Sequence, residues 1–220
     1  MGRRMLADQL QAFDRSLDHR MSVADRDILS DTWHEMQDGG TLENVLQPGA
    51  MAPQFTLPDQ NGSVVRLADR LQFGPVVLLF VRGGWCPFCA ITLRAWQDAL
   101  PRLHDAGGDL LAILPQGMER CCQTAERDLL AYPVLSDKDS TVGRTYGLAS
   151  TLPTRARELY ARLGHDLQRM NADESWRLSL MATFVIRPDG EIVVADASLK
   201  PQLWLEPDVA IKAVQNAADA

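Results

Sequence analysis

The feature that most constrains the fold is a continuous apolar segment, residues 75–81, followed within a few residues by two closely spaced cysteines. The segment is rich in β-branched and aliphatic residues, which is typical of a strand buried on both faces of a sheet. Cys86 and Cys89 follow it, with Pro87 between them at a position suited to the first turn of a helix. The sequence therefore predicts a central strand that leads into a helix carrying two thiols.

This Cys-x-x-Cys pair favours redox or nucleophilic chemistry, because unpaired N–H groups and the helix dipole stabilise a thiolate at a helix N-terminus. Strand–helix alternation around the pair supports the same interpretation. One alternative is half of a structural zinc site, which Cys121 and Cys122 cannot complete at the usual ligand spacing because they are adjacent. Another alternative is a pair of inert core cysteines. We expect neither a bound metal nor another cofactor.

The rest of the sequence predicts one α/β domain preceded by helices. Apolar residues recur at helical spacing over residues 3–38, with a break near residues 19–22. This pattern predicts a helical extension over residues 1–47, with a packing or dimerising role, and a main domain over residues 48–220. Further strands are expected at residues 55–57, 64–67, 110–114, 132–135, 183–186 and 191–194, and further helices over residues 118–131, around 156–163 and from 206 onward. The order of these elements predicts a mixed sheet covered by helices on both faces.

Charge and hydropathy exclude several classes of function. The net charge of −7 makes a general nucleic-acid surface unexpected. No segment approaches 18 uninterrupted apolar residues, so we expect no membrane span. Asp8, Gln9, Gln11 and Asp14 interrupt any apolar stretch near the beginning, which argues against a secretory signal. A cytoplasmic location is therefore the expectation.

Four motifs resemble those of peroxiredoxins, the AhpC/TSA family of the thioredoxin-like superfamily. Residues 49–59 read Gly-x-x-Ala-Pro-x-Phe-Thr-Leu-Pro-Asp, residues 132–137 read Tyr-Pro-Val-Leu-Ser-Asp, and residues 182–186 resemble the first strand of the family's late hairpin. Residues 82–89, together with Asp-Glu-Ser-Trp at 173–176, are similar to a peroxiredoxin-like branch that carries Cys-x-x-Cys. The resemblance covers roughly residues 48–218 in the right order and implies a thioredoxin-like fold.

The resemblance also implies a reaction. Peroxiredoxins carry Pro-x-x-x-Thr-x-x-Cys, in which the last cysteine attacks peroxide, and this register places Cys89 there and Cys86 at the threonine. Phe80, six residues before Cys86, has the peroxiredoxin spacing. The resemblance thus implies that Cys89 reduces a hydroperoxide and becomes a sulfenic acid. In this scheme Cys86 then reacts with this sulfenic acid to form a disulfide. The resemblance further implies an external dithiol reductant, such as a thioredoxin- or glutaredoxin-like protein, and on family grounds a homodimer.

Two departures from the family pattern affect this expectation. Cys86 stands where the family has the threonine that would orient peroxide. Met181 stands where the family has an arginine, three residues before Phe184. Losing both donors weakens the stabilisation of charge that develops as the O–O bond breaks. Arg82 is a candidate replacement charge beside the thiolate, and the alternative is an exposed arginine at the end of a strand.

Two other functions remain open. Residues 85–89, Trp-Cys-Pro-x-Cys, resemble thioredoxin-like dithiol–disulfide oxidoreductases such as those of cytochrome maturation, in which Cys86 would attack first. Those enzymes place a cis-proline shortly before the late strand, whereas residues 181–183 here are Met-Ala-Thr. The third interpretation is a redox sensor or catalytically weak scaffold whose N-terminal helices bind a partner. The sequence favours the peroxidase.

Overall fold

A five-stranded mixed sheet forms the centre of the fold in the computed structural model, which describes residues 5–17, 19–171 and 175–218. Its strand order is β5-β4-β3-β8-β9. The strands are β3 (Val76–Phe80), β4 (Asp109–Leu114), β5 (Val134–Ser136), β8 (Met181–Ile186) and β9 (Ile192–Ser198). β3, β4 and β5 run parallel, whereas β8 is antiparallel to β3 and β9 is antiparallel to β8. The predicted mixed sheet is confirmed.

Strand β3 lies in the middle of the sheet and supplies side chains to both cores. Val76, Leu78 and Phe80 pack into one apolar cluster, while Val77 and Leu79 pack into the other. This division follows from the alternation of side chains along a strand. The prediction of a strand buried on both faces is therefore confirmed.

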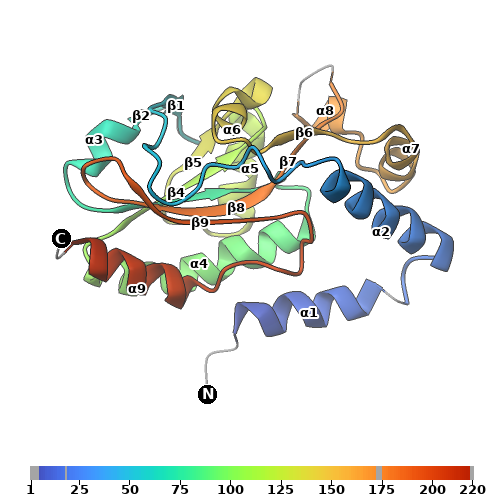
Figure 1. The fold of residues 1–220 in the computed structure, drawn as a ribbon, viewed down its shortest axis with the longest axis horizontal. Helices are drawn as coiled ribbons and strands as arrows, with labels where there is room; N and C mark the ends of the chain where they lie inside the picture. Colours follow the sequence, from blue (N-terminus) through green and yellow to red (C-terminus); the bar gives the residue numbers. More distant parts are fainter. Residues whose placement is uncertain (1–4, 18, 172–174, 219–220) are drawn as a thin grey trace.

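Helices cover one face of the sheet, and a mixture of helices and a hairpin covers the other (Figure 1). The face that carries Val77 and Leu79 is covered by four helices: α1 (Leu6–Leu17), α4 (Pro87–Asp105), α5 (Met118–Arg127) and α9 (Pro207–Ala218). The other face is covered by α2 (Val23–Asp38), the antiparallel hairpin of β1 (Thr56–Pro58) and β2 (Val64–Arg66), α3 (Leu67–Leu71), α6 (Thr141–Thr145) and α7 (Thr154–Arg162). None of the helices in the described ranges is long and apolar enough to cross a membrane.

Some short elements differ from the sequence prediction. Helix α5 ends at Arg127 rather than near residue 131, and Leu129 adopts a positive φ of 52°. The structure also contains short elements that the sequence pattern did not predict, among them α8 (Leu167–Asn171) and the antiparallel strands β6 (Ala149–Thr151) and β7 (Arg177–Ser179). Segments of three to five residues are too short to show a hydrophobic period. Asp173 and Glu174 of the predicted branch motif lie outside the described residues.

The two N-terminal helices end close to the predicted positions and pack into the main cores. Leu6 and Leu10 of α1 are buried, and the ring of Phe13 meets that of Phe88 edge-on at 4.9 Å between centroids. Helix α2 begins after Ser22, whose hydroxyl oxygen accepts a hydrogen bond from the N–H of Asp25. Both helices therefore share their apolar faces with the α/β domain.

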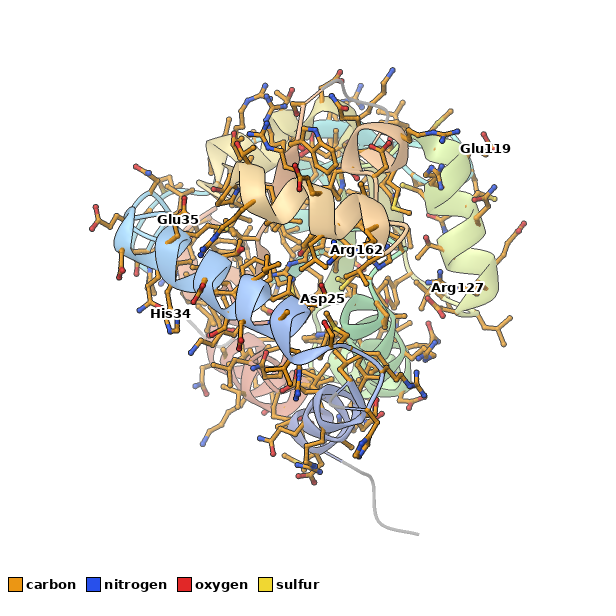
Figure 2. The ribbon with its side chains drawn as sticks, turned by 90° about the vertical axis from the view of Figure 1, so that its right-hand side faces the viewer. Asp25, His34, Glu35, Glu119, Arg127 and Arg162 are labelled. Atoms are coloured by element: carbon orange, nitrogen blue, oxygen red, sulfur yellow. The ribbon has the colours of Figure 1, made fainter. Side chains whose placement is uncertain are left out.

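Helix α2 lies antiparallel beside α7, as Figure 2 shows from the side of these two helices. The Arg155 guanidinium lies 3.3 Å from the Asp31 carboxylate and 3.6 Å from that of Glu35. At the other end of the pair, Arg162 and Asp25 form a second ion pair. The contact between α2 and α7 is thus held by charges at both ends.

Candidate active site

The two cysteines lie where β3 leads into α4. Cys86 is the N-cap residue with an extended backbone (φ −84°, ψ 119°), Pro87 is the first helical residue, and Cys89 lies in the first turn. The N–H of Cys86 donates to the carbonyl of Gly83 at 3.1 Å, which closes the turn before the helix. The prediction that both thiols lie at a helix N-terminus is confirmed.

The two glycines before the cysteines permit close approaches that a side chain would block. Gly83 has a φ of +143°, and a Cβ there would lie 2.5 Å from Nε1 of Trp85. A Cβ on Gly84 would lie 2.0 Å from the hydroxyl oxygen of Thr124 on α5. The N–H of Gly84 also donates to Oε1 of Gln116 at 2.8 Å. The loop is therefore fixed against α5 directly beside the thiols.

The two thiols have pKa values shifted in opposite directions. Both are buried, Cys86 at 3% and Cys89 at 0% exposure. The pKa of Cys86 is lowered to about 7, chiefly by a hydrogen bond from Cys89 and further by the charge of Arg82 and two backbone N–H groups, against the effect of burial. The pKa of Cys89 is raised well above its usual value, first by burial and then by its interaction with Cys86. The pair therefore carries its first negative charge on Cys86, with Cys89 protonated.

Arg82 is buried beside the thiols, at 3% exposure, so the alternative of an exposed strand-end arginine is wrong. Its Nη2 donates to the carbonyl of Leu199 at 2.6 Å. Its guanidinium carbon lies 4.5 Å from the ring centroid of Trp33 on α2. Its charge lowers the pKa of both cysteines. The structure thus brings together all three residues that the sequence singled out.

Met181 takes the position at which the family pattern has an arginine. It is buried in the apolar cluster that also contains Cys86 and Cys89. A thioether is a weak acceptor and carries no charge. Cationic stabilisation of a thiolate at this site therefore comes from Arg82, which reaches the thiols from the opposite end of the loop.

A cluster of aromatic rings, formed by Trp85, Tyr160 and His165, lies near the thiols and has no signal in the sequence pattern. The ring of Trp85 lies 6.1 Å from that of Tyr160 on α7 and 4.9 Å from that of His165. Burial raises the pKa of Tyr160 to about 12, and the charges of Arg82 and the two cysteines also act on it. Burial lowers the pKa of His165, which favours its neutral form. Tyr160 lies in a strongly charged segment far along the chain, so local pattern gives no signal that it approaches the thiols.

The other two cysteines lie on α5, and the pKa of each is raised. Cys121 is buried, with its sulfur 3.7 Å from the carbonyl oxygens of Gln116 and Leu135, and burial raises its pKa to about 12. The pKa of Cys122 is also raised, and its thiol contacts Glu126. No group of three or more His, Cys, Asp or Glu side chains within the described ranges is arranged to hold a metal ion.

Comparison with known proteins shows the family and the fold. The AhpC/TSA family matches residues 48–195. Peroxiredoxin Bcp of Escherichia coli strain K12 is 35% identical over 105 residues, which are 48% of this chain and 67% of that protein. Peroxidoxin BcpB of Mycobacterium tuberculosis has a TM-score of 0.61 at 22% identity, covering 79% of this chain and 97% of that one. Peroxiredoxin Q of Xanthomonas campestris has a TM-score of 0.60 at 17% identity, with the same coverage. The two solved structures share the thioredoxin-like fold that the motifs predicted, and the chain belongs to the AhpC/TSA family.

Proposed function

We propose that this protein is a thiol-dependent peroxidase that reduces hydroperoxides through a dithiol–disulfide cycle of Cys86 and Cys89. The observation that carries the proposal is the buried thiol pair at the N-terminus of α4, one thiol with its pKa lowered to about 7, in a chain of the AhpC/TSA family. A thiolate is the form of cysteine that attacks peroxide, so a lowered pKa gives a reactive group near neutral pH.

The electrostatics favour Cys86 as the first nucleophile. Its thiolate attacks one peroxide oxygen, the O–O bond breaks, and the sulfur becomes a sulfenic acid, while the leaving alkoxide takes a proton to become an alcohol, or a leaving hydroxide becomes water. The thiol of Cys89 then attacks the sulfenic sulfur, so that the disulfide forms and water leaves. The family register favours the reverse order, with Cys89 attacking first. Both orders end in the same disulfide.

Arg82 supplies the positive charge for this reaction. It stabilises the thiolate before attack, and a positive charge beside the reacting sulfur also favours the negative charge that develops on the leaving oxygen. This role replaces what the missing threonine and arginine supply in the family pattern. An external dithiol, of the thioredoxin or glutaredoxin kind, then reduces the disulfide by thiol–disulfide exchange.

Trapping of sulfenic acid decides the order of attack. The single variants Cys89→Ser and Cys86→Ser are treated with hydroperoxide and dimedone, and the adduct is located by peptide mass spectrometry. We expect an adduct on Cys86 in Cys89→Ser and none on Cys89 in Cys86→Ser. The opposite pattern assigns the attack to Cys89. If hydroperoxide oxidises neither thiol faster than it oxidises free cysteine, the proposed peroxidase activity is contradicted.

A dithiol–disulfide oxidoreductase is the second candidate, and the unequal pKa values of the two thiols favour it, since such an enzyme also needs one ready nucleophile and one protonated partner. The test compares reduction of insulin disulfides by the reduced protein and by an equal concentration of dithiothreitol. A faster reaction with the protein than with dithiothreitol supports this candidate, and an equal or slower one contradicts it.

A further inference from the structure

We infer that Trp33, on helix α2 of the N-terminal extension, is a positioning residue for the thiol chemistry, because its ring holds the Arg82 guanidinium beside Cys86 and Cys89. The inference rests on the proposed function and deepens it by adding a part of the chain that lies outside residues 48–195, the region matched by the family. It concerns the charge state of a thiol, which can be measured without peroxide.

Few contacts hold the guanidinium of Arg82. One face lies over the Trp33 ring at 4.5 Å, a distance at which the ring quadrupole attracts a cation. Nη2 donates to the Leu199 carbonyl at 2.6 Å, while Nε is buried with no hydrogen-bond partner within the described ranges. No carboxylate of the described residues forms an ion pair with Arg82. The hydrogen bond holds one edge of this buried planar group, and the Trp33 ring lies against its face and so helps to fix its direction.

The position of this cation matters because of the groups that face it. Cys86 and Cys89 approach from α4, and Tyr160 approaches from α7. Each of these groups becomes negative when it loses a proton, and His165 beyond Trp85 is held toward its neutral form by burial. Arg82 is therefore the positive charge that acts on the thiols, and a shift of its guanidinium changes how easily Cys86 ionises.

Tertiary packing in turn fixes the Trp33 ring. The side chain is 9% exposed and packs in the same cluster as Met36, one turn along α2. Helix α2 is anchored to α7 at one end by Arg155 and at the other by the ion pair of Arg162 and Asp25 (Figure 2). Contacts from α2 through the Trp33 ring to Arg82 therefore connect the extension to the reacting sulfur.

The test measures the pKa of Cys86 in the reduced full-length protein. Iodoacetamide alkylation of the Cys86 peptide is followed by mass spectrometry from about pH 5 to 10 in wild type, Trp33→Met, Arg82→Met and the double variant. We expect Trp33→Met to raise the pKa of Cys86 by about 0.5–1 unit, which slows alkylation at pH 7 several-fold. Because Trp33 acts through Arg82, the double variant should show no rise beyond that of Arg82→Met.

Two further variants separate positioning from packing. Met36→Ala leaves a cavity on the same helix and keeps the Trp33 ring, so it should lower the stability and leave the pKa of Cys86 unchanged. Trp33→Phe keeps a ring with a weaker quadrupole and should give a smaller rise than Trp33→Met. A wild-type pKa in Trp33→Met, an equal rise in Met36→Ala, or the same Trp33→Met shift with Arg82 removed would overturn the inference. If Trp33→Met fails to fold, Trp33→Phe decides, and a wild-type pKa there overturns it.

Discussion

At the residue scale, the hydrogen bond between the two thiols separates their pKa values. Cys89 donates to Cys86 and thereby lowers the pKa of Cys86 more than any other single contact does. The same contact holds the proton on Cys89, whose pKa burial already raises. Cys86 is therefore the thiol that ionises more easily, and Cys89 is the one that keeps its proton.

Replacing Cys89 with Ala removes this donor. We expect the pKa of Cys86 to rise from about 7, because burial then opposes ionisation with only Arg82 and the backbone N–H groups to offset it. In wild type, alkylation of Cys86 should accelerate as the pH rises through about 7, and in the variant the same increase should come at higher pH. The measurement is the pH dependence of iodoacetamide alkylation. Cys122→Ser is the control, and equal midpoints in wild type and Cys89→Ala would contradict the assigned hydrogen bond.

Replacing Gly84 with Ala should destabilise the protein through a steric clash. The added Cβ would lie 2.0 Å from the hydroxyl oxygen of Thr124, and overpacking of this kind costs about 1–3 kcal/mol. The measurement is the free energy of unfolding in urea. Gly117→Ala is the control, since a Cβ there meets nothing within 4 Å; Gly117 is the N-cap of α5, so the substitution should cost less than about 1 kcal/mol, through the poorer cap alone. Equal effects of the two substitutions would argue against the close approach of the loop to α5.

At the element scale, helix α1 depends on a residue far away in the sequence for its N-terminal hydrogen bonds. The N–H groups of Leu6 and Ala7 donate to the carboxylate of Glu206 at 3.1 and 2.7 Å. This carboxylate satisfies two of the unpaired donors of the helix and interacts favourably with the positive end of its dipole. Residues far apart along the chain are thus joined where α1 begins and α9 is about to begin.

Glu206→Ala should therefore loosen α1. Loss of the N-terminal acceptor costs about 1 kcal/mol of unfolding free energy, as loss of an N-cap does. The backbone amides of α1 should also exchange faster with solvent, which hydrogen exchange measures by residue. Glu119→Ala is the control, because Glu119 is exposed and its carboxylate accepts a hydrogen bond from Gln123 within its own helix. Exchange in α1 that stays at the wild-type rate would show that Glu206 does not hold this helix.

At the scale of the whole molecule, the extension and the α/β domain share their cores. Leu6 and Leu10 of α1 pack in the cluster that contains the thiols, and Trp33 and Met36 of α2 pack in the cluster on the other face. Apolar burial of this extent couples the stability of the two parts. Residues 1–47 and 48–220 are therefore expected to behave as one cooperative unit.

Urea unfolding tests this cooperativity. Far-UV circular dichroism, which follows all helices, should give the same midpoint and slope as hydrogen exchange measured on the amides of α1 and α2. The result follows from buried side chains of the extension, which cannot be exposed without opening the main cores. An earlier transition confined to α1 and α2 would instead describe a separately folding appendage.

Much of the fold follows from local pattern. Strand β3, helix α4 and the late hairpin were predicted because a buried strand, a Pro-led helix and a turn between two apolar runs each have a signature within a few residues. The strands β6 and β7 were missed because each has three residues and they pair across the intervening α7 and α8. Tyr160 was missed because its approach to the thiols depends on how α7 packs.

The sequence by itself determined the dithiol, its place between a buried strand and a helix N-terminus, and the family, because these depend on residues that are neighbours along the chain. Only the tertiary structure decided that Arg82 is buried against Trp33 and that the first charge falls on Cys86. The physical reason is that a thiol's pKa depends on burial and on charges within a few ångströms. Cys89 and the first N–H groups of α4 lie close to Cys86 along the chain, whereas burial and the placement of the Arg82 charge against Trp33 of α2 arise only on folding.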